Sequence, residues 1–564
     1  MNFNTYQYER PNFESFKQKY NSLLNLFISS TNKEASIEAL NSLNSLRNNW
    51  DSKAQIAFIR NSINTKDEFY EKEQAFFDEY GPLNAELDNK YFKALVNSKF
   101  EPDLAEHFGV QFINLAKAQL KTFDSSIIPD LQLENKLVSS YSKLISSGTV
   151  EFDGKTMPIT KLGPYMVSSD RNVRKNARIA SVTFFEENED EFDTIYDKLV
   201  KIRTQIALKL GFDSFTELAY LRLGRTDYDK QMVSSYRQSI VKQIVPITST
   251  LYKQQCERLG LDKLKIYDEN YRFNTGNPTP KDSADIMLKN GLKMYQELSP
   301  ETGTFFEKML NENFLDVLSK DGKAPGGYCT MISDLKMPFI FSNFNGTQGD
   351  VDVLTHETGH AFQAYQSRNL QIPEYKFPTY EASEIHSMSM EFLTWPWMNL
   401  FFGEDTEKYY YSHLSSALLF MPYGALIDHF QHDVYANPTW SPEKRKERYS
   451  ELEKIYQPDR DYDGIDYLER GNLWVRQTHV FMEPFYYIDY TLAQICALQF
   501  WINNNKDKEQ TWQKYLDLCS LGGSKSFLDL LNSIDLLSPF EPECISNVAC
   551  EVNKFLDSID ASSF

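Results

Sequence analysis

The sequence has few cysteines and none of the hydrophobic segments that mark secretion or membrane insertion. Its six cysteines are spread over 564 residues, and no two form a CxxC pair. So sparse a set predicts free thiols in a reducing compartment. The N-terminus, MNFNTYQYERPNF, predicts no signal peptide, and no run reaches the roughly 18 apolar residues of a membrane span. We therefore expect a cytoplasmic protein.

Positive charge is also in short supply. Lys and Arg number 59 against 79 Asp and Glu, which gives a formal net charge of −20. Phosphate backbones and anionic membranes attract surfaces rich in Lys and Arg. Neither a nucleic acid nor a membrane is therefore expected as a partner, and the sequence leaves the oligomeric state open.

Strand-like patterns are rare, and helical periodicity covers most of the chain. Apolar residues recur at three- and four-residue steps over 12–30, 32–50, 66–100 and 171–211. The third run is expected to break at Gly81-Pro82 and the fourth to end at Gly211. Two regions predict short strands, 149–160 as a hairpin around Asp153-Gly154 and 326–347 as two strands joined around Asp334.

These patterns predict a mainly α fold with a few short strands near the active site. No cluster of residues suited to catalysis occurs before about residue 200. We therefore expect a helical N-terminal lobe over 1–200 and a catalytic region over 201–564, with the lobes interleaved.

The segment THETGHAFQAYQ (355–366) carries the strongest functional signal. Four residues apart on a helix, His356 and His360 can point two imidazoles at one ion. Glu357 lies one step round the same helix, where it can hold a water. This HExxH arrangement predicts Zn²⁺ with Glu357 as the general base. The alternative is two histidines on the surface of an ordinary helix.

A third metal ligand is expected downstream, in YEASEIHSMSMEF (380–392). The candidates are Glu381, Glu384, His386 and Glu391. Glu384, Ser387 and Glu391 share one helical face, so Glu384 could bind the metal while Glu391 supports the site.

Two neighbours of the motif each have a functional and an ordinary interpretation. Asp352, one turn before His356, could accept the second N–H of that histidine, or could be an acidic residue at a helix N-terminus. The strand PFIFSNF, just before the motif, could offer a free edge to an extended peptide, or could belong to a hairpin packed on helices.

HETGH at 356–360 followed by EIHSMSME at 384–391 resembles the M3 family of zinc metallopeptidases, in particular its oligoendopeptidase F branch and the shorter Pz-peptidase-like members. The likeness extends to YLRLGRTDYD (220–229), PGGYCT (325–330), PFIFSNFNGTQGDVDVLTHETGHAFQ (338–363) and LGGSKSFLDLL (521–531). It implies a two-lobed, almost all-helical body with a deep channel that admits short unstructured peptides.

The resemblance also implies roles for individual residues. Glu384 would complete the ligands of one Zn²⁺ per chain, with Glu391 beside them. In RQTHVFMEPFYYIDYTLAQICALQFW (476–501), His479 and either Tyr486 or Tyr490 would reach the scissile carbonyl and stabilise its oxyanion; Tyr487 is also a candidate. Residues expected to contact substrate are Gly326, Gly327, Tyr328 and Asn343, although the glycines could also form a plain turn.

Other candidate residues have simpler interpretations. His429 and His432 lie three apart but have no third-ligand pattern, so they predict a structural or surface role. His107 and His413 are isolated and are expected at the surface or with satisfied hydrogen bonds. Cys329 is expected to be a packing residue.

The sequence therefore predicts a zinc endopeptidase that hydrolyses oligopeptides, with Glu357 moving the proton. A metallocarboxypeptidase with the same zinc chemistry is one alternative, and it would need a cationic residue for the substrate's terminal carboxylate. A peptide-binding helical shell with a silent metal motif is the other.

Overall fold

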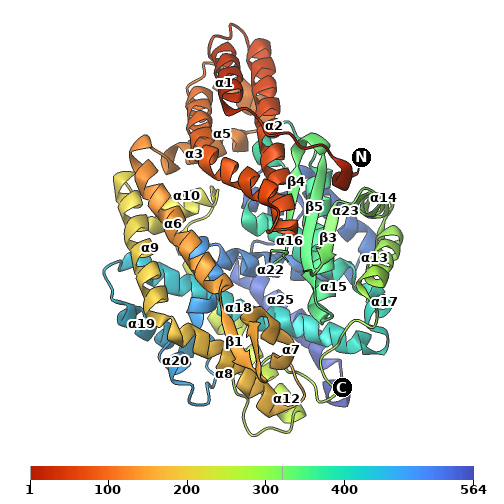
Figure 1. Cartoon of the computed structure of the whole chain (residues 1–564). Coiled ribbons are helices and arrows are strands. Elements are labelled where there is room, and N and C mark those ends of the chain that lie inside the picture. Colours follow the sequence, from red (N-terminus) through yellow and green to blue (C-terminus); the bar gives the residue numbers. More distant parts are fainter. Residues whose placement is uncertain (1, 321, 325) are drawn as a thin grey trace.

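The computed structural model describes residues 2–320, 322–324 and 326–564, and most of them are helical (Figure 1). The predicted mainly α class is confirmed. The first helices form a bundle that projects from one end of the molecule: α1 (Phe13–Ile28), α2 (Lys33–Ile63), α3 (Glu68–Val96), α4 (Glu101–Phe108) and α5 (Val110–Thr122). They enclose an apolar cluster of their own, which includes Tyr20, Leu40 and Tyr91.

A larger apolar cluster includes Phe3, Ile56 and Ile59 of the N-terminal part and the helices that follow. These are α6 (Ile128–Ser146), α7 (Gly163–Met166), α8 (Arg171–Glu187), α9 (Glu189–Lys209), α10 (Phe215–Arg222), α11 (Lys230–Gln243), α12 (Val245–Arg258), α13 (Ala284–Leu298) and α14 (Pro300–Asn311). Helices α6, α8 and α9 pack into the same cluster as the later helices. The division of the chain at residue 200 stays a proposal.

The remaining helices continue the larger cluster and carry the predicted site. They are α15 (Gln348–Gln366), α16 (Tyr380–Leu393), α17 (Asn399–Phe402), α18 (Thr406–Ala436), α19 (Pro442–Tyr456), α20 (Asp466–Glu469), α21 (Thr478–Met482), α22 (Tyr487–Asn504), α23 (Lys508–Leu521), α24 (Phe527–Ser533) and α25 (Pro542–Asp557). No helix of the described residues is long and apolar enough to cross a membrane.

Two helical predictions need correction. Pro82 lies inside α3, which continues through the expected break. A proline removes its own backbone hydrogen bond, but a helix held by its packing can tolerate this loss. The run 171–211 does end at Gly211, whose φ of 83° suits glycine, but it is interrupted at Asn188 into α8 and α9.

Both predicted strand pairs are present. β1 (Thr149–Phe152) and β2 (Lys155–Pro158) form an antiparallel hairpin. Asp153 and Gly154 between them have φ of 52° and 69°, as a type I′ turn requires. β4 (Tyr328–Ile332) and β5 (Met337–Phe344) are antiparallel, and a third strand, β3 (Leu315–Leu318), pairs with β5 in parallel.

The edge strand of this sheet is not the predicted one. The strand order is β3-β5-β4, so β5 is paired on both sides and has no free edge for a peptide. The edge strand beside the metal-binding helix is β4. Sequence reasoning missed this arrangement because it did not find β3, which precedes the predicted pair of strands in the chain.

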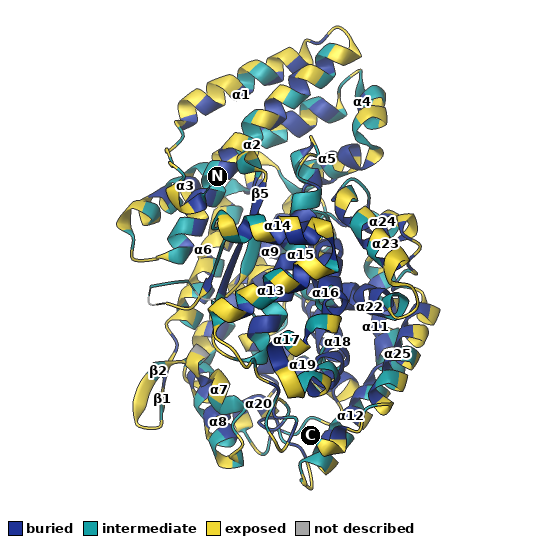
Figure 2. Cartoon of the chain, turned by 90° about the vertical axis from the view of Figure 1, so that its right-hand side faces the viewer, coloured by how far each residue is buried: buried dark blue, intermediate teal, exposed yellow. Residues whose placement is uncertain are grey.

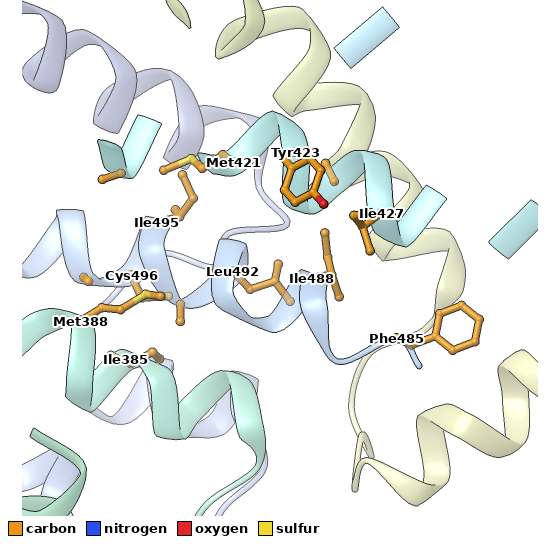
Figure 3. Close-up of a cluster of buried hydrophobic side chains, with 14 of the residues drawn as sticks. Ile385, Met388, Met421, Tyr423, Ile427, Phe485, Ile488, Leu492, Ile495 and Cys496 are labelled. Atoms are coloured by element: carbon orange, nitrogen blue, oxygen red, sulfur yellow. The ribbon is translucent and has the colours of Figure 1, made fainter. Parts of the chain in front are cut away.

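Helices α16, α18 and α22 pack together beneath the site. Figure 3 shows α22 between the other two helices, with Met388 of α16 near Cys496 of α22 on one side and Met421 of α18 near Ile495 of α22 on the other. Figure 2 shows α16 and α22 as largely buried helices inside the molecule. Most residues of α16 and α22 are buried, so the close packing of this core holds the site-bearing helices rigidly.

Candidate active site

Three side chains from α15 and α16 converge on one point. Oε2 of Glu384 lies 3.2 Å from Nε2 of His356 and 3.4 Å from Nε2 of His360. Ligand atoms placed 2.0–2.2 Å from a tetrahedral ion lie roughly 3.3–3.6 Å from one another, so the spacing fits Zn²⁺. No other group of three such ligands occurs among the described residues.

The glycine of HETGH allows the two helices to come this close. A Cβ on Gly359 would lie 2.7 Å from both the carbonyl oxygen of His386 and the Cα of Ser387. Real Cβ atoms essentially never approach backbone atoms so closely. Gly359 therefore permits the backbone contact between α15 and α16 that brings Glu384 to the histidines.

Glu384 is held by four groups. Ser387 Oγ donates to its Oε2 at 2.8 Å, and the hydroxyl of Tyr486 donates to its Oε1 at 2.8 Å. Burial opposes ionisation, but the two histidines hold the pKa of the Glu384 carboxyl well below its ordinary value. Glu384 is therefore a fixed carboxylate suited to a metal.

The second nitrogen of His356 faces Glu391 rather than Asp352. Nδ1–H of His356 donates to Oε1 of Glu391 at 2.7 Å. The carboxylate of Asp352 instead accepts from the hydroxyl of Tyr409 at 2.9 Å and from the amide of Gln348. Asp352 lines the wall of the site cavity, where the hydroxyl of Tyr409 of α18 holds its carboxylate.

His413 belongs to this arrangement and was missed by sequence reasoning. Its Nε2–H donates to Oε2 of Glu391 at 2.7 Å, and its Nδ1 accepts from the indole N–H of Trp395 at 3.1 Å. His413 has satisfied hydrogen bonds, as expected, but it also fixes the carboxylate that orients His356. Only the tertiary contact between α18 and α16 brings His413 to Glu391, so no local sequence motif predicts this role.

Glu357 differs from the other carboxylates. It is 8% exposed, and its Oε2 has no hydrogen-bond partner in the described part of the chain. Burial raises the pKa of its carboxyl above 4.5, against the lowering effect of His356 and His360. A buried carboxylate with a free oxygen beside a metal group is well placed to accept a proton.

His479 and Tyr490 lie across the cavity from the metal group. The cavity has a volume of about 460 Å³ and is lined by His356, Glu391, His413, His479 and Tyr490 among others. The amide of Gln477 donates to Nδ1 of His479 at 2.9 Å, so Nε2 carries the proton and points at the Tyr490 oxygen, 3.4 Å away. The Tyr490 hydroxyl also hydrogen-bonds the Tyr486 hydroxyl, and it can donate its hydrogen to an acceptor in the cavity.

Known proteins match this chain along most of its length. The family described as "Peptidase M3 N-terminal domain" matches residues 3–123, and "Peptidase family M3" matches residues 165–546. The chain belongs to peptidase family M3.

The solved structures place it in one branch of that family. A structure of Pz peptidase A with an inhibitor is 52% identical, with a TM-score of 0.96, and covers 99% of this chain and 100% of its own. A putative oligoendopeptidase F from Bacillus anthracis is 48% identical, with a TM-score of 0.91, over 100% of this chain and 99% of that one. An oligoendopeptidase F homolog of Borreliella burgdorferi is 23% identical over 71% of this chain and 70% of its own length.

The resemblance to the M3 family found in the sequence is therefore confirmed. The chain is a metallo-oligoendopeptidase of the oligoendopeptidase F and Pz-peptidase type. The alternatives of a carboxypeptidase and of a silent peptide-binding shell are set aside.

The predicted substrate loop lies beside Glu357. Gly326 and Gly327 are exposed, and a Cβ on Gly327 would be 3.8 Å from Oε1 of Glu357. Tyr328 stacks on Phe341 within the sheet. The amide of Asn343 donates to the carbonyls of Ala324 and Gly326 at 2.9 Å, so it supports the loop from below. Pro325 lies outside the described residues.

The other histidines lie away from the metal group. Nδ1 of His429 contacts the hydroxyl of Tyr456 at 3.0 Å, and Nε2 of His432 contacts that of Tyr220 at 3.2 Å. His107 is exposed. Cys329 packs against the larger apolar cluster, and burial raises the pKa of its thiol well above the ordinary value, which keeps it protonated.

Proposed function

We propose that this chain is a zinc-dependent endopeptidase of short unstructured peptides, with one Zn²⁺ held by His356, His360 and Glu384. The supporting observation is the approach of two imidazole nitrogens to one carboxylate oxygen, at 3.2 and 3.4 Å, next to a buried carboxylate oxygen that has no partner among the described residues. When bound there, Zn²⁺ lowers the pKa of a water and polarises the substrate carbonyl.

In this proposal the chain's own residues move one proton and stabilise one negative charge. Glu357 accepts the proton of the attacking water through its free oxygen and later donates it to the leaving amine. Tyr490 donates its hydroxyl hydrogen to the oxygen of the carbonyl as that oxygen becomes negative. His479, whose pKa burial lowers to about 4, is neutral at pH 7 and holds the Tyr490 oxygen through Nε2–H.

The test is cleavage of peptides blocked at both ends, mapped by mass spectrometry, together with zinc analysis. We expect internal cleavage that a chelator abolishes and that zinc restores, with about one zinc per chain. Cleavage only at free C-termini would support a carboxypeptidase, and metal-free activity would contradict the proposal.

Three further expectations remain proposals. The lobe boundary at residue 200 rests on the lack of residues suited to catalysis before it, and the deep channel rests on the resemblance. The cytoplasm as compartment rests on the sparse cysteines, all six of which are free thiols in the structure.

A further inference from the structure

A second cavity lies beside the edge strand β4, apart from the one at the metal group. Its volume is about 470 Å³, and it opens between β4 and helix α2. Thr330 and Met331 of β4 line one side, and Asp51 and Gln55 of α2 line the other. The hydroxyl of Thr330 donates to Oε1 of Gln55 at 2.8 Å, which joins the two walls.

This cavity lies within reach of a peptide bound at the active site. Strand β4 begins one residue after Gly327, where a Cβ would be 3.8 Å from Oε1 of Glu357. Thr330 and Met331 follow three and four residues later, roughly 10–13 Å away at about 3.3 Å per residue. An extended peptide advances at the same rate, so its third or fourth residue from the scissile bond would lie at the cavity.

Lys376 places a poorly compensated cation on the wall of the cavity. The residue is 6% exposed, and its Nζ donates to Oδ1 of Asn48 at 2.6 Å. An ammonium has three N–H donors, and the one hydrogen bond that Nζ makes to a described residue is the one to Asn48. The carbonyl of Lys376 accepts from Gln363 and Ser367, which fixes the lysine to the metal-binding helix.

The other charges of the cavity do not satisfy this ammonium. Arg47 pairs with Asp88 at 2.9 Å and with Glu374 at 2.6 Å, so these two acids are already compensated. Asp51 is exposed. Burial lowers the pKa of Lys376 to about 8, despite the attraction of Asp51, Asp334 and Glu374. A buried cation that is so weakly supported favours an incoming anion.

We propose that Lys376 binds a carboxylate of the substrate, three or four residues from the scissile bond. This inference rests on the proposed endopeptidase function. The carboxylate could be the peptide's C-terminus or an Asp or Glu side chain, since both present the same group. Lys376 would then contribute to the choice of cleavage site and to the length of peptide that is preferred.

The test uses internally quenched peptides that share one scissile bond and are paired by charge. In one pair the chain ends three or four residues after the bond with either a free carboxylate or an amide. In the other pairs Glu or Gln occupies the third or fourth position on either side of the bond. For at least one pair we expect kcat/KM to be about tenfold higher with the carboxylate, the order of one charge-assisted hydrogen bond.

Variants at Lys376 separate substrate binding from a structural role. Lys376→Gln, which keeps a donor for Asn48, should bring the carboxylate-to-neutral ratio to about one, and Lys376→Arg should keep the preference. Lys336→Gln is the matched control, because Lys336 is exposed and also donates to an asparagine, Asn369, at 2.9 Å.

Several outcomes would overturn the inference. One is a wild type that shows no preference for the carboxylate peptides, and another is an unchanged carboxylate-to-neutral ratio of kcat/KM in Lys376→Gln. A third is an equal loss of kcat/KM on both members of each pair in Lys376→Gln, which would show that Lys376 has a structural role only. A wild type that cleaves none of the peptides would contradict the proposed function instead.

Discussion

Glu357 and Glu384 have the same side chain and lie in one site, yet their surroundings give them different roles. Glu384 accepts hydrogen bonds at both oxygens and keeps a low pKa. Glu357 keeps one oxygen without a partner among the described residues and has a raised pKa. Environments that separate the pKa values of paired carboxylates are how a site assigns them different tasks.

The raised pKa of Glu357 predicts the acid side of the pH profile. The ionised form is the base, so kcat/KM should fall as the pH is lowered through this pKa, above the ordinary 4.5. His479, with a pKa of about 4, is neutral at pH values well above 4 and should not set the fall in rate there. Rates measured from pH 4 to 8, with zinc content checked at each pH, would test this. A flat profile down to pH 4 would contradict it.

The two tyrosines should respond differently to loss of the hydroxyl. Tyr490→Phe removes the proposed oxyanion donor, so kcat should fall by about 10²–10³ with KM little changed and zinc retained. The Tyr486 hydroxyl is bonded to Glu384, so Tyr486→Phe should chiefly weaken zinc binding, by about 10–100-fold. Phe keeps the ring and its packing in both. A full kcat in Tyr490→Phe would show that His479 or the metal, and not Tyr490, stabilises the oxyanion.

At the scale of elements, the site depends on how closely α15 and α16 approach. The backbone contact at Gly359 sets the distance between the two helices, and Glu384 lies on α16, across that contact from the histidines. Helix α18 then brings His413 to the same carboxylate network from outside.

Gly359→Ala should therefore separate the two helices. The new Cβ would meet backbone atoms at 2.7 Å, so we expect a loss of about 2–3 kcal/mol in the free energy of unfolding and weaker zinc binding. Gly349→Ala in the first turn of α15 is the matched control. Its Cβ would meet only the Thr347 hydroxyl, at 3.4 Å, and should be neutral or stabilising by up to about 1 kcal/mol. Equal unfolding curves for the two variants would refute the role of the contact.

Spacing within one helix could be predicted from the sequence, but contacts between distant helices could not. His356, Glu357 and His360 follow from helical periodicity, and the face of Glu384 and Glu391 follows in the same way. His413 and the pairing of β3 with β5 depend on long-range packing, which leaves no local pattern. Asp352 is near His356 in the sequence and was the predicted acceptor for its second N–H. In the structure Glu391, which is distant in the sequence, accepts that hydrogen bond.

At the scale of the whole molecule, the metal group lies in a cavity walled by α15, α16, α18 and α22 and beside the β4 edge. A chain must be extended to bring a peptide bond there. We therefore expect rapid cleavage of peptides of about 5–20 residues and almost none of a folded protein. A length series compared with a native globular substrate measures this. Efficient digestion of the native substrate would contradict it.

The role of Glu357 as the general base is tested most directly by measuring the zinc content of Glu357→Gln together with its kcat. The substitution removes the base and leaves His356, His360 and Glu384 in place. We expect about one zinc per chain, as in the wild type, with most of the hydrolytic rate lost. A variant that keeps zinc and a near-wild-type kcat would show that Glu357 is not the base.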